Sequence, residues 1–529
     1  MGIKRYIASE DNTITNAFKH SLTTRGYDAN MGASDILEVF SIYGQATTSS
    51  AETSRILVKF PIADISADRT AGSVPASGNV NFYLRIYNAK HSQTLPRDYK
   101  LVFLPISQSW DEGGGVDMDE YKDKGFPTIT GSTWMTASYT NPWHTPGGDF
   151  YVKPVYTQTF KDGPEDIEVN ITSMVEEWMA GTKPNYGVGI FLTGSQEAYV
   201  ESVASIDKSD KSPARSVLAN AAGAKRSYYT KKFHGRTSEF FFKRPVIEAR
   251  WDGHLTDDRS NFYYSSSLGD IEDNRNTLYL YNFVRGKLKN IKGIGTKQAI
   301  YVSLYSGSIN NSIPTGSKLS ASGDSKNISQ TIMTNITGGY AWQGTGIYTA
   351  SFALTGNTEG ILTQVFDVWH NGSGSVLKAG TIQYATGTFN PVFLSASMSS
   401  PNSKYIVSMP DLQSEYDGNE IVRFRVKNRM KYWQPNNYIV ASSPAQNIII
   451  ESGSFKVYRV KDDLEIIRHC TGSSDKETLM SYDQDGNFFD LDMKLLKPDV
   501  AYGLEYAYYD GDKWVIQKDR FKFRVEKKE

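Results

Sequence analysis

A repeated alternation of apolar and polar residues constrains the fold more than any other feature of this sequence. In residues 80–87 the even positions are all apolar: Val80, Phe82, Leu84 and Ile86. Because successive side chains of a β-strand point to opposite faces, a period of two predicts a half-buried strand. The pattern returns at residues 56–60 and 188–192. With 33 Tyr, 25 Phe and 44 Gly residues, it predicts an all-β protein of many strands and tight turns.

The strand patterns group into successive modules, which predicts three tandem β-sandwich domains at residues 1–252, 276–389 and 390–529. In the second, the Asn371-Gly372 pair after residues 365–369 predicts a tight hairpin. Residues 346–350, Gly-Ile-Tyr-Thr-Ala, are similar to the tyrosine corner of immunoglobulin-like sandwiches. Asp-Gly pairs at 417–418, 485–486 and 510–511 predict turns in the third. We expect the second and third modules to be immunoglobulin-like.

A few segments depart from the strand pattern. Ser173 and Glu176 have the spacing of a capping box, and Val175 and Trp178 share one face, so a short helix is expected, ending near Gly181. Residues 110–148 are expected to form an ordered loop, and the polar residues 253–275 a linker or an entry loop. The apolar residues 240–242 predict a strand.

Charge, cysteine content and hydropathy indicate the cellular compartment and the kinds of partner that the protein has. The 57 basic and 58 acidic residues leave a net charge of −1, which predicts neither a nucleic-acid partner nor a membrane partner. Cys470 is the only cysteine, so no intramolecular disulfide can form. The N-terminus has no apolar core of a signal peptide, and no apolar run is long enough to span a membrane. We expect a protein made in the cytoplasm that stays soluble.

The sequence lacks the motifs that carry common catalytic chemistry. Its seven histidines are scattered, and no nucleophile elbow, phosphate-binding loop or dinucleotide fingerprint occurs. His469 and Cys470 are neighbours on an expected strand, so they point to opposite faces and cannot act as a base and its nucleophile. Gly113-Gly114-Gly115 has acidic neighbours and predicts a flexible turn. We therefore expect no enzymatic activity.

Two acidic clusters have the composition of calcium sites, although a solvated loop and a hairpin turn are the alternatives. Calcium is bound by six to eight oxygen ligands, many of them carboxylates. The candidate ligands are Asp111, Asp117 and Asp119 in one loop, and Asp483, Asp485 and Asn487 around Gly486. No other cofactor is expected.

Two further segments are candidates for binding. Trp110, Trp134 and Trp143 form a glycan-binding platform if they are exposed, whereas the alternative is that they fasten the long loop to the sandwich. Residues 208–236 are rich in Lys and Arg, and we expect this stretch to dock on an acidic neighbour, such as the 111–123 loop of another copy. The interface residues named from it are Lys208, Lys211, Arg226, Lys231 and Lys232.

A series of motifs in residues 26–238 resembles a known family. They are Gly26-Tyr27-Asp28-Ala29-Asn30-Met31-Gly32, Ser54-Arg55, Trp110-Asp111-Glu112-Gly113, Gly147-Gly148-Asp149, Asn185-Tyr186-Gly187 and Arg236-Thr237-Ser238. In this order they resemble the DNRLRE family of jelly-roll domains, which are similar to some carbohydrate-binding modules. The resemblance implies an N-terminal jelly roll that presents surfaces and carries no reactive pocket.

The C-terminal part carries a second resemblance. Residues 481–493, with Ser481-Tyr482-Asp483 and Phe488-Phe489-Asp490-Leu491, are similar to structural proteins of T4-like tailed bacteriophages. This implies a virion protein assembled in the host cytoplasm, packed in the tail, baseplate or neck beside other virion proteins and copies of itself. The alternative is a virion protein that recognises a glycan of the host surface.

Overall fold

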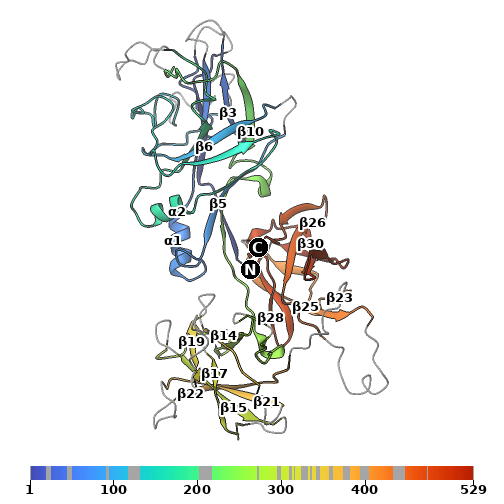
Figure 1. Ribbon diagram of the computed structural model, residues 1–529. Coiled ribbons are helices and arrows are strands. Elements are labelled where there is room, and N and C mark those ends of the chain that lie inside the picture. Colours follow the sequence, from blue (N-terminus) through green and yellow to red (C-terminus); the bar gives the residue numbers. More distant parts are fainter. Residues whose placement is uncertain are drawn as a thin grey trace. The chain divides into compact units, whose positions relative to one another are not determined.

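The protein divides into two compact units, which are described separately: an N-terminal unit, Ile3–Arg250, and a C-terminal unit, Trp251–Glu529 together with Met1–Gly2 (Figure 1). The computed structural model describes residues 2–19, 25–44, 51–90, 95–116, 131–201, 217–267, 269–270, 273–294, 300–308, 313–314, 316–322, 332–333, 336–340, 346–356, 362–372, 382–393, 404–432, 447–472 and 475–527.

The N-terminal unit is a β-sandwich of a four-stranded sheet, in the order β1-β11-β5-β8, and a seven-stranded sheet, in the order β10-β3-β4-β9-β6-β7 with β2 paired to β4. Its strands are β1 (Ile3–Ile7), β2 (Glu10–Thr15), β3 (Ile36–Ile42), β4 (Glu52–Lys59), β5 (Asn81–Ile86), β6 (Tyr99–Pro105), β7 (Tyr156–Phe160), β8 (Ile167–Asn170), β9 (Val188–Leu192), β10 (Tyr228–His234) and β11 (Val246–Arg250). Phe82, Leu84 and Ile86 on β5 are fully buried, as their alternation predicts.

Two short helices of this unit lie against each other (Figure 1). The sequence predicts the second, α2 (Thr172–Met179), whose Val175 and Trp178 are buried and which is followed by Gly181 at a φ of +71°. The first, α1 (Ile62–Thr70), is not predicted because it buries only Ile62 and Ile65 and so has no apolar stripe. The expected strand at residues 240–242 is wrong, since a 3-10 turn, η3 (Phe241–Lys243), forms there.

The C-terminal unit begins with a seven-stranded sheet in the order β12-β20-β19-β15-β21-β22, with β16 paired to β15, and two small two-stranded sheets, β13-β14 and β17-β18. The strands are β12 (Asn276–Tyr281), β13 (Phe283–Val284), β14 (Lys287–Leu288), β15 (Ile300–Gly307), β16 (Lys318–Leu319), β17 (Ala321–Ser322), β18 (Ile332–Met333), β19 (Ile336–Tyr340), β20 (Ile347–Phe352), β21 (Gln364–His370) and β22 (Gln383–Phe389). The Tyr348 hydroxyl accepts a hydrogen bond from Ile291 N at 2.9 Å, so this tyrosine ties β20 to an adjacent loop.

Two expectations for this part are corrected. Strands β21 and β22 do pair, but Asn371 bonds to Ile382, so the connection is longer than the tight turn that Asn371-Gly372 predicts. For residues 253–275 the linker is the wrong alternative and the entry loop is not contradicted: a 3-10 turn, η4 (Asp258–Ser260), lies within them, and Phe262 is fully buried. Arg259 there forms a buried two-point ion pair with Asp367, at 2.6 and 2.8 Å.

The remaining strands form a four-stranded sheet, β23-β25-β29-β28, and a six-stranded sheet, β24-β32-β30-β26-β27 with β31 paired to β30. They are β23 (Tyr405–Ser408), β24 (Glu415–Asp417), β25 (Ile421–Met430), β26 (Gly453–Arg459), β27 (Leu464–Ile467), β28 (Ser481–Asp483), β29 (Gly486–Asp492), β30 (Val500–Tyr509), β31 (Trp514–Ile516) and β32 (Phe521–Glu526), with a 3-10 turn η5 (Met493–Leu495). Aromatic rings fill the core between them: Phe455 stacks on Phe489 with centroids 4.0 Å apart. The described chain is all-β, as predicted.

Candidate functional site

The three tryptophans expected to form a glycan platform are buried, which contradicts the exposed arrangement. Trp110, Trp134 and Trp143 are 3%, 1% and 1% exposed. The Trp110 indole donates to Tyr186 O at 2.7 Å and the Trp143 indole to Thr133 O at 2.9 Å. These bonds satisfy the indole N–H groups inside the protein, so the rings fasten the long loop to the sandwich, which was the alternative interpretation.

The expected calcium sites are not assembled by the described residues. Asp111 is exposed in its loop, while Asp117 and Asp119 lie outside the described residues. Asp483 pairs with Arg425 at 2.8 Å, and the Asn487 side chain is buried between Asn428 and Ile450.

Asp485 lies in the turn of the hairpin that joins β28 to β29. The segment therefore forms the hairpin that the sequence also allowed. No group of three or more His, Cys, Asp or Glu side chains in the described part of the chain is arranged to hold a metal ion.

The Lys and Arg residues of the basic stretch, residues 208–236, differ in whether they are described, exposed or buried. Lys208 and Lys211 lie outside the described residues. Arg226 stacks over the Tyr228 ring, and Lys232 forms an ion pair with Glu38 at 3.1 Å. Lys231 contradicts its assignment as an interface cation, because it is 1% exposed.

The surroundings of Lys231 explain its burial. Its Nζ donates to Asn88 Oδ1 and lies 5.0 Å from the centre of the Phe233 ring. Burial lowers the pKa of this ammonium group to about 8. A partner would meet Lys232 on this strand, not Lys231.

His469 and Cys470 follow the end of β27 at Ile467, so the strand expected there does not form, and the two side chains make separate contacts. His469 Nδ1 lies 3.3 Å from Ser454 Oγ, whereas Cys470 is buried and its N donates to Thr478 Oγ1 at 2.8 Å. Burial raises the pKa of the Cys470 thiol to about 12, so it is no reactive thiolate at neutral pH.

The motifs of the N-terminal unit converge on one another in the interior. Asn30 donates to Glu112 O at 2.7 Å, and both Glu112 carboxylate oxygens accept from Arg236 at 2.8 and 2.7 Å. Gly115 N donates to Asn30 Oδ1, and a Cβ at Gly115 would lie 1.7 Å from Asn30 O. The expected flexible turn at residues 113–115 is therefore a tightly packed one.

A second group of motif residues lies around Arg55 on β4. The Arg55 guanidinium makes two bonds through Nη2 to the Glu197 carboxylate, at 3.0 and 3.1 Å, and one through Nη1 to Gly147 O at 3.1 Å. It also lies 4.6 Å from the centre of the Phe191 ring. Both oxygens of the Glu197 carboxylate are thereby bonded to one guanidinium nitrogen.

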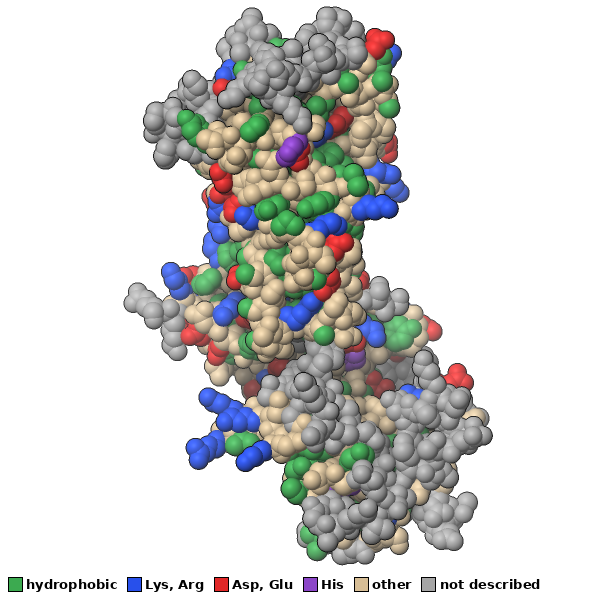
Figure 2. All heavy atoms as spheres, turned by 90° about the vertical axis from the view of Figure 1, so that its left-hand side faces the viewer, with side chains coloured by type: hydrophobic (Ala, Val, Ile, Leu, Met, Phe, Trp, Pro, Cys, Tyr) green, Lys and Arg blue, Asp and Glu red, His purple; other side chains and the backbone are tan. Residues whose placement is uncertain are grey.

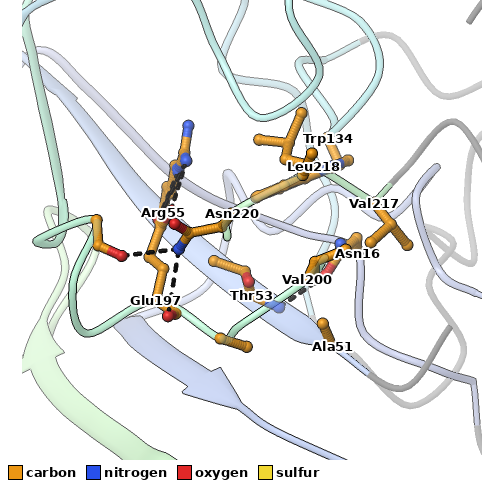
Figure 3. Close-up of a pocket in the computed structure, with 13 residues that line it drawn as sticks. Asn16, Ala51, Thr53, Arg55, Trp134, Glu197, Val200, Val217, Leu218 and Asn220 are labelled. Carbon is orange, nitrogen blue, oxygen red and sulfur yellow. Dashed lines mark hydrogen bonds and ion pairs between the residues drawn. The ribbon is translucent and has the colours of Figure 1, made fainter. Parts of the chain in front are cut away.

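Beside this ion pair lies a cavity of about 240 Å³ (Figure 3). Its polar wall consists of Asn16, Thr53, Arg55, Glu197 and Asn220, and its apolar wall of Ala51, Trp134, Val200, Val217 and Leu218. Figure 3 shows Arg55, Glu197 and Asn220 grouped at one end, with Trp134, Val217 and Leu218 at the other. The volume is below the roughly 300–1,000 Å³ of pockets for drug-sized ligands.

The cavity combines amide and hydroxyl groups with an apolar wall. The Asn220 amide donates to Gly194 O at 2.7 Å, and Thr53 N donates to Asn16 Oδ1 at 2.7 Å, so the polar wall is held by its own hydrogen bonds. The paired charges of Arg55 and Glu197 compensate each other. This arrangement fits a small uncharged polar molecule, such as one sugar unit, or the side chain of a partner.

The sequence does not predict Glu197 and Asn220 as cavity residues. They lie 23 positions apart in irregular segments, and the antiparallel bridge between Val200 and Asn220 brings them together. No motif or periodicity marks either residue, so only the long-range pairing identifies them.

Comparison with known proteins adds no family. No family model and no curated protein match the chain. Solved structures with similarity include a marsupial T cell receptor (9% identity, 52% of this chain and 71% of that one, TM-score 0.14). Others are the two tandem V-type regions of a v-region-containing chitin binding protein (8%, 52% and 97%, TM-score 0.13) and a DUF4785 family protein from Legionella pneumophila (8%, 98% and 92%, TM-score 0.12). TM-scores this low carry no argument about function.

Proposed function

We propose that this protein is a non-enzymatic structural protein of a tailed-bacteriophage virion, which packs through its β-sandwich surfaces as a repeated subunit of the tail, baseplate or neck. The proposal starts from the resemblance of residues 481–493 to phage structural proteins. It is supported by where the motif residues lie. Asn30, Glu112 and Arg236 bond to one another and so hold loops together. Because these polar side chains bond within the protein, we place the function on the outer surfaces of the β-sandwiches.

One surface suited to packing lies at the edge of the seven-stranded sheet. Val152 and Val155, 81% and 52% exposed, precede β7, which ends the sheet and pairs with β6. On the face drawn in Figure 2, hydrophobic side chains stand at the surface among charged ones of both signs. An edge strand with apolar neighbours is a favourable place for another β-domain to pack.

The test is to locate the protein in particles and to interrupt its packing. Immunogold labelling of purified virions is expected to decorate the tail, baseplate or neck, and light scattering is expected to show self-association of the purified chain. Val152→Asp combined with Val155→Asp is expected to weaken assembly, whereas Ile421→Asp, at an exposed isoleucine of the C-terminal unit, leaves it unchanged. Particles without label and a strictly monomeric chain contradict the proposal.

A second candidate function is glycan recognition in the cavity beside Arg55. The observation that favours it is the joining of amide and hydroxyl groups with an apolar wall that includes Trp134. Titration calorimetry with small neutral saccharides is expected to detect binding that Thr53→Val, which removes one hydroxyl, weakens roughly fivefold. Thr70→Val on α1, outside the cavity, is the control. Heats equal to buffer dilution with every saccharide exclude this function.

A further inference from the structure

A small hairpin of the C-terminal unit has a fixed geometry and an unusual surface. It consists of β13 and β14, in which Phe283 pairs with Leu288 and Val284 with Lys287 (Figure 1). The turn residues Arg285 and Gly286 both have positive φ, 53° and 74°. Two such residues make the tight turn whose twist matches that of paired strands, so the hairpin is well formed.

The base of the hairpin is anchored by hydrogen bonds. Asn282 N donates to Gly346 O at 2.8 Å, and Lys289 N donates to Asn282 O at 3.0 Å. The Asn282 side chain donates to Lys289 O at 2.6 Å, while Gly346 N donates to Asn290 Oδ1 at 2.8 Å. Leu288 packs against a buried cluster that includes Ile347. The tip is therefore held out in one orientation.

The tip joins exposed apolar residues with positive charge. Phe283 and Val284 are 59% and 43% exposed. The hairpin and the residues just after its base also carry exposed cations that form no ion pair with a carboxylate in the described part of the chain: Arg285, Lys287, Lys289 and Lys292. Residues 274–323 contain seven Lys or Arg and no Asp or Glu. This local excess of positive charge is not apparent from the net charge of −1 for the whole chain.

We propose that this basic hairpin, residues 282–292, binds the surface of a membrane that contains anionic phospholipids. Phe283 and Val284 enter the boundary between headgroups and acyl chains, while the four cations lie at the level of the phosphates. Phe283 and Val284 occupy opposite faces of the hairpin, so a surface that surrounds the tip covers both. This proposal is independent of the virion role.

A lipid surface accounts for the tip better than the other anionic partners do. Single-stranded nucleic acid is usually bound in a charged groove lined with aromatic rings, whereas this element is a convex tip that carries an aliphatic residue beside its one aromatic ring. An acidic protein would satisfy the cations, but it would need a recess for apolar groups on both faces of the hairpin. A fluid interface provides both environments at once.

The test is partition of the full chain into sedimenting vesicles. Vesicles of phosphatidylcholine mixed with phosphatidylglycerol are expected to bind the protein, and vesicles of phosphatidylcholine alone to leave it in solution. Added salt is expected to weaken binding, because the headgroup charges are screened. Each cation removed should lower the partition coefficient about fivefold, so Lys287→Ala with Lys289→Ala should lower it about 25-fold.

Two further variants distinguish binding through the hairpin from binding through any exposed positive charge. Phe283→Ser with Val284→Ser is expected to lower partition roughly tenfold while every charge is kept. Lys427→Ala with Lys431→Ala removes two exposed lysines of the same unit that are not part of the hairpin and is expected to change little. All variants must unfold thermally as the wild type does, since the altered side chains are exposed.

Several results would overturn the proposal. They are equal partition into neutral and anionic vesicles, an equal loss in the Lys427 and Lys431 control, and no partition at all. Retention on immobilised DNA without partition into vesicles would show that the hairpin serves a nucleic acid instead. Particle labelling is measured separately, so its failure would bear only on the virion role.

Discussion

Glu112 joins three parts of the sequence that are far apart. Its carboxylate accepts from Arg236 and from Asp11 N, the latter at 2.8 Å, and its carbonyl accepts from Asn30. Charge-assisted bonds that are partly shielded from water are stronger than neutral ones. This residue therefore links strand β2 near the start of the unit to the turn that follows β10 near its end.

Replacing Glu112 is expected to cost more than replacing its neighbour. Glu112→Ala leaves the Arg236 guanidinium and Asp11 N without this acceptor, so we expect the free energy of unfolding to fall by about 2 kcal/mol. Asp111→Ala removes an exposed carboxylate and should change it by less than about 0.5 kcal/mol. Urea unfolding followed by tryptophan fluorescence measures both, and equal losses would show that the Glu112 contacts contribute little.

Asp11 should make stability depend on pH. Burial is the largest cause that raises its pKa, from 3.8 to about 7, against the opposing hydrogen bond from Arg236 N. Because the folded state binds the proton more tightly, the contribution of this group is fully present below about pH 4. It is lost as the pH rises towards 7.

We therefore expect Asp11→Asn to flatten the dependence of the free energy of unfolding on pH between 4 and 7. Asp35→Asn, at an exposed aspartate, is the control and should leave the slope unchanged. Denaturant titrations at several pH values measure the slope. Parallel curves for wild type and Asp11→Asn would show that Asp11 titrates normally in the folded protein.

Single residues also mark where prediction from the sequence fails. Lys231 belongs to a basic stretch, yet it is buried while Lys232 is paired on the surface. The identity of a residue does not tell which face of its strand is covered when apolar and charged residues do not alternate. The same holds for Trp134, whose burial depends on how its loop folds back.

At the scale of elements, long periodic segments are predicted well and short ones poorly. The strand around Phe82 follows from alternation alone. Helix α1 has too few buried residues to show a helical period, and residues 240–242 are apolar without being paired to another strand. Asn371 favours a tight turn, but the registers of β21 and β22 determine the loop length.

Two glycines at the ends of elements should respond differently to the same substitution. Gly187 precedes β9 with a φ of +92°, and a Cβ there would lie 2.2 Å from Val58 O. Gly187→Ala is expected to lower the free energy of unfolding by about 3 kcal/mol or more, because the backbone must shift.

Gly181, after α2, has a φ of +71° with open space around it, so Gly181→Ala should cost only about 1 kcal/mol. Chemical denaturation of both variants measures the difference. Equal costs would indicate that the positive φ accounts for the loss in both variants, and that a small shift removes the clash between the new Cβ at residue 187 and Val58 O.

At the scale of the whole molecule, global composition conceals local features. The balanced charge predicts no anionic partner, although residues 274–323 are strongly basic. The cavity beside Arg55 depends on the pairing of Val200 with Asn220, which no local pattern records. The all-β class is predictable from the sequence because it rests on many repeated signals, whereas a site that rests on one long-range pairing is not.

The two compact units predict two steps in thermal unfolding. Each unit has its own sheets and buried residues, so calorimetry of the full chain is expected to resolve two transitions. Gly187→Ala should lower the temperature of one transition only, that of the N-terminal unit. A single transition that shifts as a whole would show that the units unfold together.

Strands β1 and β11 pair in antiparallel register, with Ile3 opposite Arg250, and Trp251 N donates to Gly2 O at 2.8 Å. The points where the backbone enters and leaves the N-terminal unit are thus immediate neighbours. A domain whose two ends are adjacent can be exchanged as a whole. Another domain with closely spaced termini can be inserted at the same junction with little change to the backbone of the C-terminal unit. Exchange of whole modules at this junction is therefore a route by which such a chain could acquire new surfaces.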